Sequence, residues 1–107
     1  MRMYKVCPDY MSSGLMKVNL YDDSPYLYLD QQGCRQLLTP DTYQLLSLCQ
    51  QIFDQTDSWS SEDADYKFPN FISRKQYEIL CWLVARRVES ETGVTTIASF
   101  YWENDNV

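Results

Sequence analysis

One segment, residues 73–93, most constrains how this 107-residue chain can fold, because it carries the strongest helix signal. Ser73 and Gln76 match a capping box, which marks the first turn of a helix. Gly93 supplies the left-handed residue at which helices commonly end. Between these signals, apolar residues recur at helical spacing and spread beyond a single face: Tyr77, Ile79, Leu80, Trp82, Leu83, Val84 and Val88. We expect so apolar a helix to be covered on more than one side.

A second helix is predicted from residue 40 to about residue 54. Thr39 can cap its first turn, Pro40 suits the first helical position, and Asp41 favours the positive end of the helix dipole. The expected apolar face consists of Leu45, Leu46, Leu48, Cys49, Ile52 and Phe53. The expected solvent face consists of Gln44, Ser47, Gln50 and Gln51.

The N-terminal half of the chain predicts a β-hairpin. In residues 15–21, Met16, Val18 and Leu20 alternate with polar residues, which is the period-two pattern of a half-buried strand. After a polar break, residues 26–29 resume an alternation of aromatic and aliphatic side chains. Two such runs around a short polar turn are typical of a hairpin.

Two further segments, residues 2–6 and 94–102, are also predicted to be strands, whereas residues 34–38 fit either a strand or the approach to a helix. Strands placed early with helices after them predict an α+β fold. We expect a single domain over residues 1–107, in which a small antiparallel sheet (the N-terminal hairpin plus the C-terminal strand) packs against two helices. Leu80 and Val84 should be nearly fully buried in its core.

The residue types argue against an enzyme or a metal site. The chain has no histidine, the commonest general acid and base at neutral pH, so histidine-based catalytic arrangements are excluded. Its cysteines, Cys7, Cys34, Cys49 and Cys81, are scattered without a CxxC pair. With no signal-peptide pattern, free thiols and a cytoplasmic location are expected. We expect neither cofactor nor metal, and the longest apolar run is too short to cross a membrane.

Acidic residues give the chain a net charge of −6, which disfavours nucleic acid and anionic membranes as direct partners and allows a basic protein. No basic residue occurs between Arg35 and Lys67, and an acidic, aromatic cluster lies in this span. We predict that this cluster binds the partner together with residues of the hairpin: Asp54, Asp57, Trp59, Glu62, Asp63, Asp65 and Tyr66, with Asp22, Asp23 and Tyr26.

The density of charge limits this hypothesis. Duplex DNA carries one charge about every 1.7 Å, whereas five carboxylates over 12 extended residues give one about every 8 Å. The cluster alone is therefore too dilute to imitate a duplex, and mimicry would need other acidic residues nearby. A solvated loop is the alternative interpretation.

A small, acidic, aromatic-rich chain without a catalytic signature is similar in composition to the inhibitors that phages and mobile elements direct against host defence, such as anti-CRISPR and anti-restriction proteins. This resemblance implies a non-enzymatic, stoichiometric inhibitor of another protein, one whose own ligand is nucleic acid. Toxin-neutralising immunity proteins share the profile. The alternatives from other classes are a small enzyme or metal-binding domain that uses carboxylates, and a subunit that self-associates through exposed tyrosines.

Overall fold

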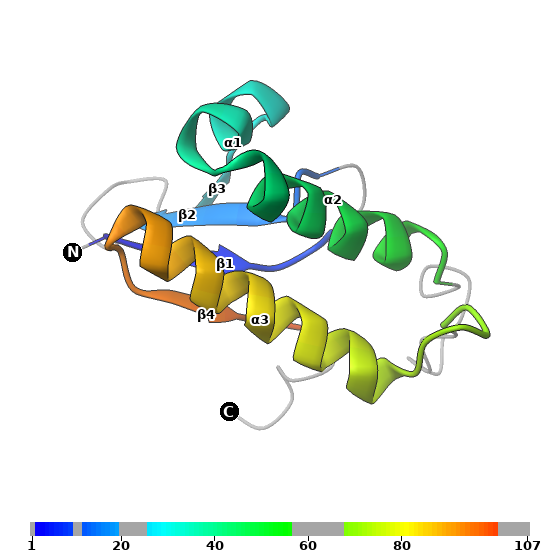
Figure 1. The fold of residues 1–107 in the computed structure, drawn as a ribbon. Coiled ribbons are helices and arrows are strands. Elements are labelled where there is room, and N and C mark those ends of the chain that lie inside the picture. Colours follow the sequence, from blue (N-terminus) through cyan, green and yellow to red (C-terminus); the bar gives the residue numbers. More distant parts are fainter. Residues whose placement is uncertain (1, 10–11, 20–25, 57–67, 101–107) are drawn as a thin grey trace.

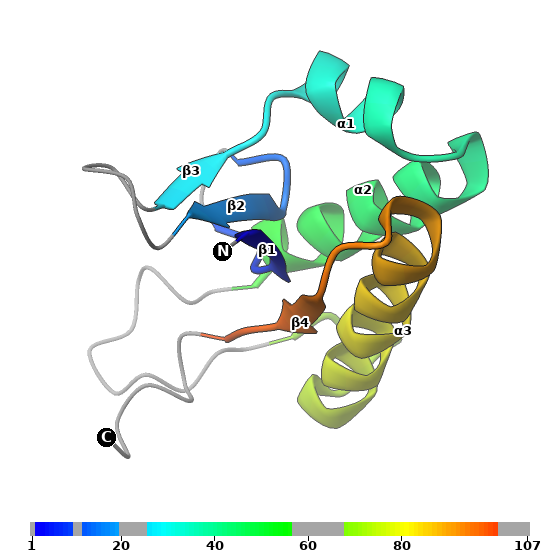
Figure 2. The same ribbon diagram turned by 90° about the vertical axis from the view of Figure 1, so that its left-hand side faces the viewer.

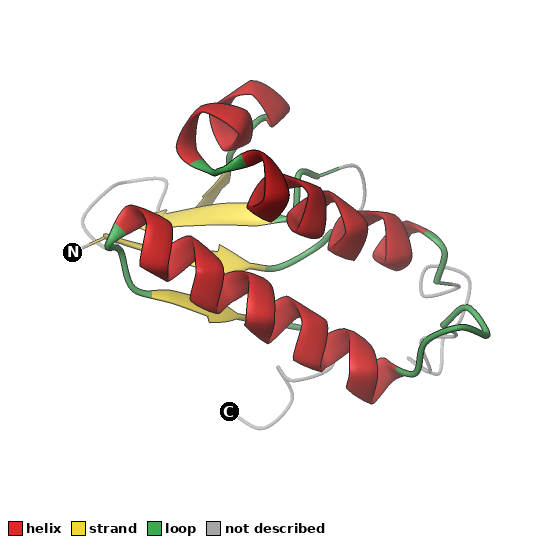
Figure 3. Cartoon of the chain, viewed as in Figure 1, coloured by secondary structure: helices red, strands yellow, loops and turns green. Residues whose placement is uncertain are grey.

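The computed structural model of the chain describes residues 2–9, 12–19, 26–56 and 68–100. Helices and strands follow one another in an order that groups three strands first (Figures 1 and 3). They are β1 (Arg2–Val6), β2 (Leu15–Asn19), β3 (Tyr26–Tyr28), α1 (Gln31–Leu37), α2 (Pro40–Asp54), α3 (Arg74–Thr92) and β4 (Thr96–Ala98).

The described strands form one sheet in the order β3-β2-β1-β4, and α2 and α3 cover one of its faces (Figure 2). β2 pairs antiparallel with both β1 and β3, so the predicted hairpin is present. β4 lies beside β1 and runs parallel to it. The predicted α+β fold is therefore confirmed, with one parallel pair in the sheet and one additional short helix, α1.

Both long helices begin where their capping residues predict, and α3 also ends at the predicted glycine. The side chain of Thr39 accepts a hydrogen bond from the Thr42 N–H at the start of α2. Ser73 and Gln76 form the complete capping box of α3. Gly93 ends α3 at φ 73°, a left-handed conformation that glycine adopts without steric cost.

The short helix α1 resolves the ambiguity of residues 34–38, which lie in this helix and its C-terminal cap. Asp30 caps α1, and its Oδ1 accepts a hydrogen bond from the Gly33 N–H at 2.6 Å. Cys34 is the buried residue of α1 and joins the core. Because a helix of about two turns buries few residues, the apolar pattern of this segment is too short to distinguish a helix from a strand.

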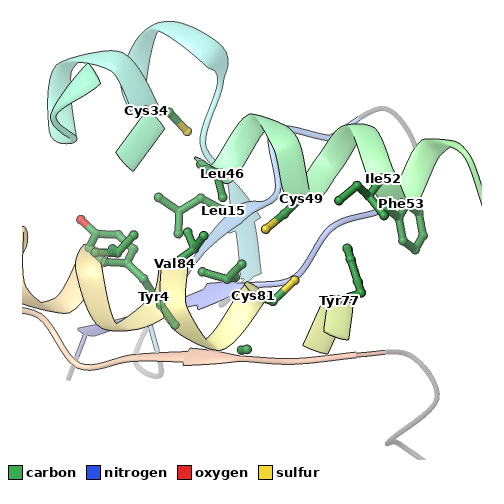
Figure 4. Packing of buried hydrophobic residues seen from close by; sticks show 14 of the residues in the cluster. Tyr4, Leu15, Cys34, Leu46, Cys49, Ile52, Phe53, Tyr77, Cys81 and Val84 are labelled. Carbon is green, nitrogen blue, oxygen red and sulfur yellow. The ribbon is translucent and has the colours of Figure 1, made fainter. Parts of the chain in front are cut away.

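The core lies between the two long helices and the sheet (Figure 4). Leu46, Cys49 and Ile52 enter it from α2, and Tyr77, Cys81 and Val84 enter it from α3. Val84 is fully buried, as predicted. Leu80 is only partly buried and packs against the edge of the core, so the expectation of near-complete burial is wrong for this residue.

β2 is buried on both faces rather than on one. Leu15 is opposite Val6 in the ladder and lies with it in the helix-facing core. Val18 is three residues further on and therefore points to the other face of the sheet, yet it is only 2 % exposed. The alternating pattern thus identified the strand but not the extent of its burial.

Gln50 is predicted to lie on the solvent face of α2, but its side chain is buried. It forms hydrogen bonds with Asp9 and Ser12 in the β1–β2 connection. Its Oε1 accepts hydrogen bonds from the Ser12 hydroxyl at 2.9 Å and the Asp9 N–H at 3.3 Å. Its Nε2 donates to the Asp9 carbonyl at 2.6 Å and to Asp54 Oδ1 at 2.9 Å. The amide of Gln50 therefore accepts two hydrogen bonds through its oxygen and donates two through its nitrogen.

We expect Gln50→Ala to lower the free energy of unfolding by about 2 kcal/mol, because it leaves partly buried polar groups of the β1–β2 connection without this partner. Gln51→Ala removes the same side chain from the neighbouring, exposed position and should change stability by less than about 0.5 kcal/mol. Urea unfolding of both variants measures the difference. Equal losses would show that the Gln50 contacts contribute nothing specific.

All four cysteines are free thiols and buried, in agreement with the sequence. Cys49 of α2 and Cys81 of α3 direct their sulfur atoms into the space between the helices (Figure 4). The hydrogen bond to Cys81 and burial both raise the pKa of the Cys49 thiol, and burial also raises the pKa values of Cys7 and Cys34. These thiols are therefore small core residues held in the unreactive, protonated form.

Candidate functional site

Ten residues are predicted from the sequence to bind a partner, and the structure describes the side chain of one of them. Asp54, the last residue of α2, is exposed, and its carboxylate accepts the hydrogen bond from Gln50. Tyr26 begins β3 and pairs with Val18, but its side chain lies outside the described part of the chain. The other eight also lie outside it: Asp22, Asp23, Asp57, Trp59, Glu62, Asp63, Asp65 and Tyr66.

A different surface is prominent on α3. Ile79, Trp82 and Leu83 are 56 %, 41 % and 56 % exposed, respectively. They occupy little more than one turn of the helix, so their side chains are neighbours on its surface. We call these three residues the outer stripe. Their exposure corrects the expectation that the apolar surface of α3 is covered on more than one side.

Helical geometry explains why the outer stripe cannot join the core. The buried residues of α3 recur every three or four positions, which defines a single inward face: Tyr77, Cys81, Val84, Ala85 and Val88. Successive residues are rotated by about 100° around the helix axis, so Ile79 and Leu83 lie on the side opposite that face. α3 therefore has one apolar face against the sheet and α2, and a second apolar surface directed outward.

A shallow groove of about 670 Å³ is lined mainly by the outward surface of α2, with Arg87 of α3 beside it. Gln44, Leu48 and Gln51 of α2 line one wall, and Arg87 of α3 contributes to the other. Leu48 is 40 % exposed, so its predicted place on the apolar core face of α2 is wrong. Leu83 precedes Arg87 by four residues and lies on the same side of α3, next to this groove.

Basic residues bound the outer stripe at both ends. Lys75 precedes Ile79 by four residues and Arg86 follows Trp82 by four, and both are exposed. Four of the eight basic residues in the described part of the chain belong to α3: Arg74, Lys75, Arg86 and Arg87. By contrast, eight of the 15 acidic residues of the chain lie outside the described part.

The two carboxylates near the C-terminal end of α3 are directed toward other elements of the fold. Glu89 accepts a hydrogen bond from the Thr96 N–H in β4 at 2.9 Å. Glu91 accepts hydrogen bonds from the Thr39 N–H at 2.8 Å and from the hydroxyls of Thr39 and Thr42, across the start of α2. Both carboxylates therefore link the C-terminal half of α3 to neighbouring elements of the fold.

Glu91 is a structural carboxylate. Partial desolvation raises its pKa, but the hydrogen bonds from Thr39 and Thr42, together with the charge of nearby Arg87, outweigh this effect and hold the pKa below its ordinary value. Arg87 also donates from Nε to the Thr42 hydroxyl at 2.9 Å. This network joins the C-terminal end of α3 to the N-terminal end of α2.

A pH titration of stability tests the role of Glu91. Because folding lowers its pKa, the ionised form stabilises the folded state above the unfolded pKa of about 4.3, and this contribution is lost as the pH falls through the lower folded value. Glu91→Gln should therefore lose up to about 1 kcal/mol at pH 7 and flatten the decline of stability between about pH 5 and pH 3. An unchanged pH profile for Glu91→Gln would contradict the assignment.

Other kinds of site are not supported by the described residues. Among residues 2–9, 12–19, 26–56 and 68–100, no group of three potential ligands is arranged to hold a metal ion. None of the helices formed by these residues has both the length and the hydropathy needed to cross a bilayer. Comparison of the chain with protein-family models, curated proteins and solved structures finds no match. The chemistry of the surface itself is therefore the basis for a functional proposal.

Proposed function

We propose that this chain is a non-enzymatic module that binds another protein, and that the outer stripe is the centre of the contact. The observation that carries this proposal is the exposure of Ile79, Trp82 and Leu83 together on one side of α3. Contiguous apolar surface with a charged rim is typical of interaction sites. Removing it from water contributes roughly 25 cal/mol per Å², and tryptophan is among the residues that most often dominate binding energy.

The polar groups of the described residues favour binding over catalysis. The α2–α3 groove contains a single carboxylate, Asp41, whereas carboxylate-based acid–base chemistry needs two with separated pKa values. The groups whose pKa values are shifted have structural roles, since the thiols and Tyr77 are buried in the core and Glu91 caps α2. These observations support a module that acts by occupying a surface.

The role that we propose for this binding is stoichiometric inhibition of a protein whose own ligand is nucleic acid. The net charge of −6 and the acidic cluster support this role, and the compositional similarity to phage-encoded inhibitors agrees with it. The acidic cluster lies mostly outside the described residues, so a basic surface on the partner remains a prediction from the sequence. The outer stripe adds a described apolar contact to that hypothesis.

Capture from an extract of the cells that produce the protein tests the proposal. Wild type and Gln36→Asp, which changes an exposed position on α1, should retain the same protein in a ratio near one to one. Leu83→Asp should retain less than about a tenth of it while remaining folded, with a loss of stability of no more than about 1 kcal/mol, because the change is confined to the surface. Retention of the same protein by all three, or of none by wild type, would contradict the proposal.

A further inference from the structure

The charges around the outer stripe indicate which kind of partner surface it would bind. We infer that the outer stripe binds an amphipathic helix of the partner whose apolar face is bounded by two carboxylates about 11 residues apart. This inference rests on the proposed function and specifies the partner at the same surface. It concerns the described face of α3, whereas the basic partner surface predicted from the sequence concerns the acidic cluster.

The spacing of the carboxylates follows from the positions of Lys75 and Arg86. Both side chains are exposed on the same side of α3 as the outer stripe, one at each end of it. Eleven residues of helix separate them by about 16 Å along the axis. A partner helix that lies along α3 would therefore meet both cations with carboxylates at about the same spacing, with its apolar residues over Trp82 and Leu83 between them.

The carboxylates of α3 nearest to these two charges are Glu78, three residues after Lys75, and Glu89, three residues after Arg86. Glu89 and Glu91 accept hydrogen bonds from β4 and from the start of α2, respectively. Lys75 lies in the first turn of α3, where the positive end of the helix dipole makes a cation unfavourable. A carboxylate from a partner would interact favourably with both Lys75 and the helix dipole, so the unfavourable placement of Lys75 is offset in a complex.

The shape of the surface favours a helix as the bound element. Leu83 lies one turn before Arg87, which lines the α2–α3 groove, and Leu48 adds an exposed apolar side chain to the lining of that groove. α2 and α3 lie side by side in front of the sheet (Figure 1). An amphipathic helix that lays its apolar face along an exposed apolar surface is a common mode of protein recognition.

The same charges disfavour a second copy of this chain as the occupant. An antiparallel arrangement that lays residues 79–83 of two copies on each other places Lys75 of one copy opposite Arg87 of the other, beside Arg86. A parallel arrangement places Lys75 opposite Lys75 and Arg86 opposite Arg86. Both arrangements bring like charges together, which is unfavourable at an interface, and the net charge of −6 on each copy adds further repulsion.

Three synthetic helical peptides of about 18 residues provide the test. The first has leucines at helical spacing with glutamates 11 residues apart at the ends of the apolar face. The second has lysines in place of these glutamates, and the third moves the glutamates to the polar face. By fluorescence anisotropy at low ionic strength, the full chain should bind the first peptide at least about tenfold more tightly than either of the others, and added salt should reduce the difference.

Variants of the full chain complete the test. Lys75→Glu with Arg86→Glu should reverse the preference toward the lysine peptide, and Leu83→Asp should weaken binding of all three by about tenfold or more. Equal affinities for the three peptides, or a self-associated wild type that Leu83→Asp converts to monomer in sedimentation, would overturn the inference. If capture from the extract depends on Leu83 while the peptides do not discriminate, the proposed function stands and the carboxylate-bounded helix is wrong.

Discussion

Val84→Asp is expected to leave the protein unfolded at 25 °C, whereas Leu83→Asp is expected to leave it folded. Val84 is fully buried in a cluster of apolar residues, so an aspartate there places a carboxylate among apolar side chains. The cost of burying an unpaired charge is several kcal/mol, comparable to the whole stability of a small domain. Leu83 is the adjacent residue but points outward, so its replacement should cost no more than about 1 kcal/mol, mainly through lower helix propensity.

Circular dichroism and urea unfolding of the two variants measure this contrast. Because both changes introduce the same charge at neighbouring positions of one helix, net charge and position along the helix dipole are matched. Two folded variants, or two unfolded ones, would show that α3 does not have the single inward face that its burial pattern defines.

Leu46→Ala is expected to produce the second largest loss, about 3–5 kcal/mol of the free energy of unfolding. Leu46 is fully buried between α2 and the sheet, and its replacement leaves a cavity that the rigid surroundings cannot fill. Gly14, at φ 92°, brings the β1–β2 connection so close that a Cβ on it would lie 3.3 Å from Leu46 Cδ1. Leu48→Ala, two residues along the same helix, should cost less than about 1 kcal/mol because Leu48 is 40 % exposed.

Denaturant unfolding at constant m-value compares these two leucines directly. A loss below about 1 kcal/mol for Leu46→Ala would mean that α2 is rotated from its described orientation. A large loss for Leu48→Ala would mean that another part of the chain covers the α2–α3 groove, and the surface described above would then belong to the core.

The limits of the helices are the part of the fold that the sequence predicts best. Thr39 and Pro40 place the start of α2, and Ser73, Gln76 and Gly93 place both ends of α3. These signals are local, because each residue satisfies or terminates the backbone of its own helix. The parallel pairing of β4 with β1 depends on contacts between distant segments, and no local pattern specifies it.

The sequence-based interpretation is wrong about which residues of α2 and α3 face the core and which face solvent. Hydrophobicity alone cannot distinguish a core residue from an exposed contact residue, so Trp82 and Leu83 are predicted to be covered and are exposed. The reverse error occurs at Gln50, whose amide is buried because the backbone of Asp9 and the hydroxyl of Ser12 satisfy it. These polar partners lie about 40 positions away in the sequence. The hydrophobic pattern within one helix therefore does not predict them.

The candidate site illustrates the same limit. The sequence draws attention to the acidic cluster through composition, whereas the outer stripe has no unusual composition and lies within the most regular helix. One signal could have identified it: the apolar residues of α3 are too many for a single inward face, and the surplus lies between Lys75 and Arg86. An exposed apolar surface with basic residues at both of its ends is typical of a surface that binds a partner.

Site-specific photo-crosslinking tests most directly whether the outer stripe binds another protein. A photoreactive phenylalanine analogue is placed at Leu83 in one variant and at Gln32, exposed on α1, in another, within the cells that produce the protein. Irradiation of the Leu83 variant should yield one discrete adduct with another protein, and irradiation of the Gln32 variant should not. Crosslinks of equal yield from both positions, or none from Leu83, would contradict the proposal that the outer stripe is the binding surface.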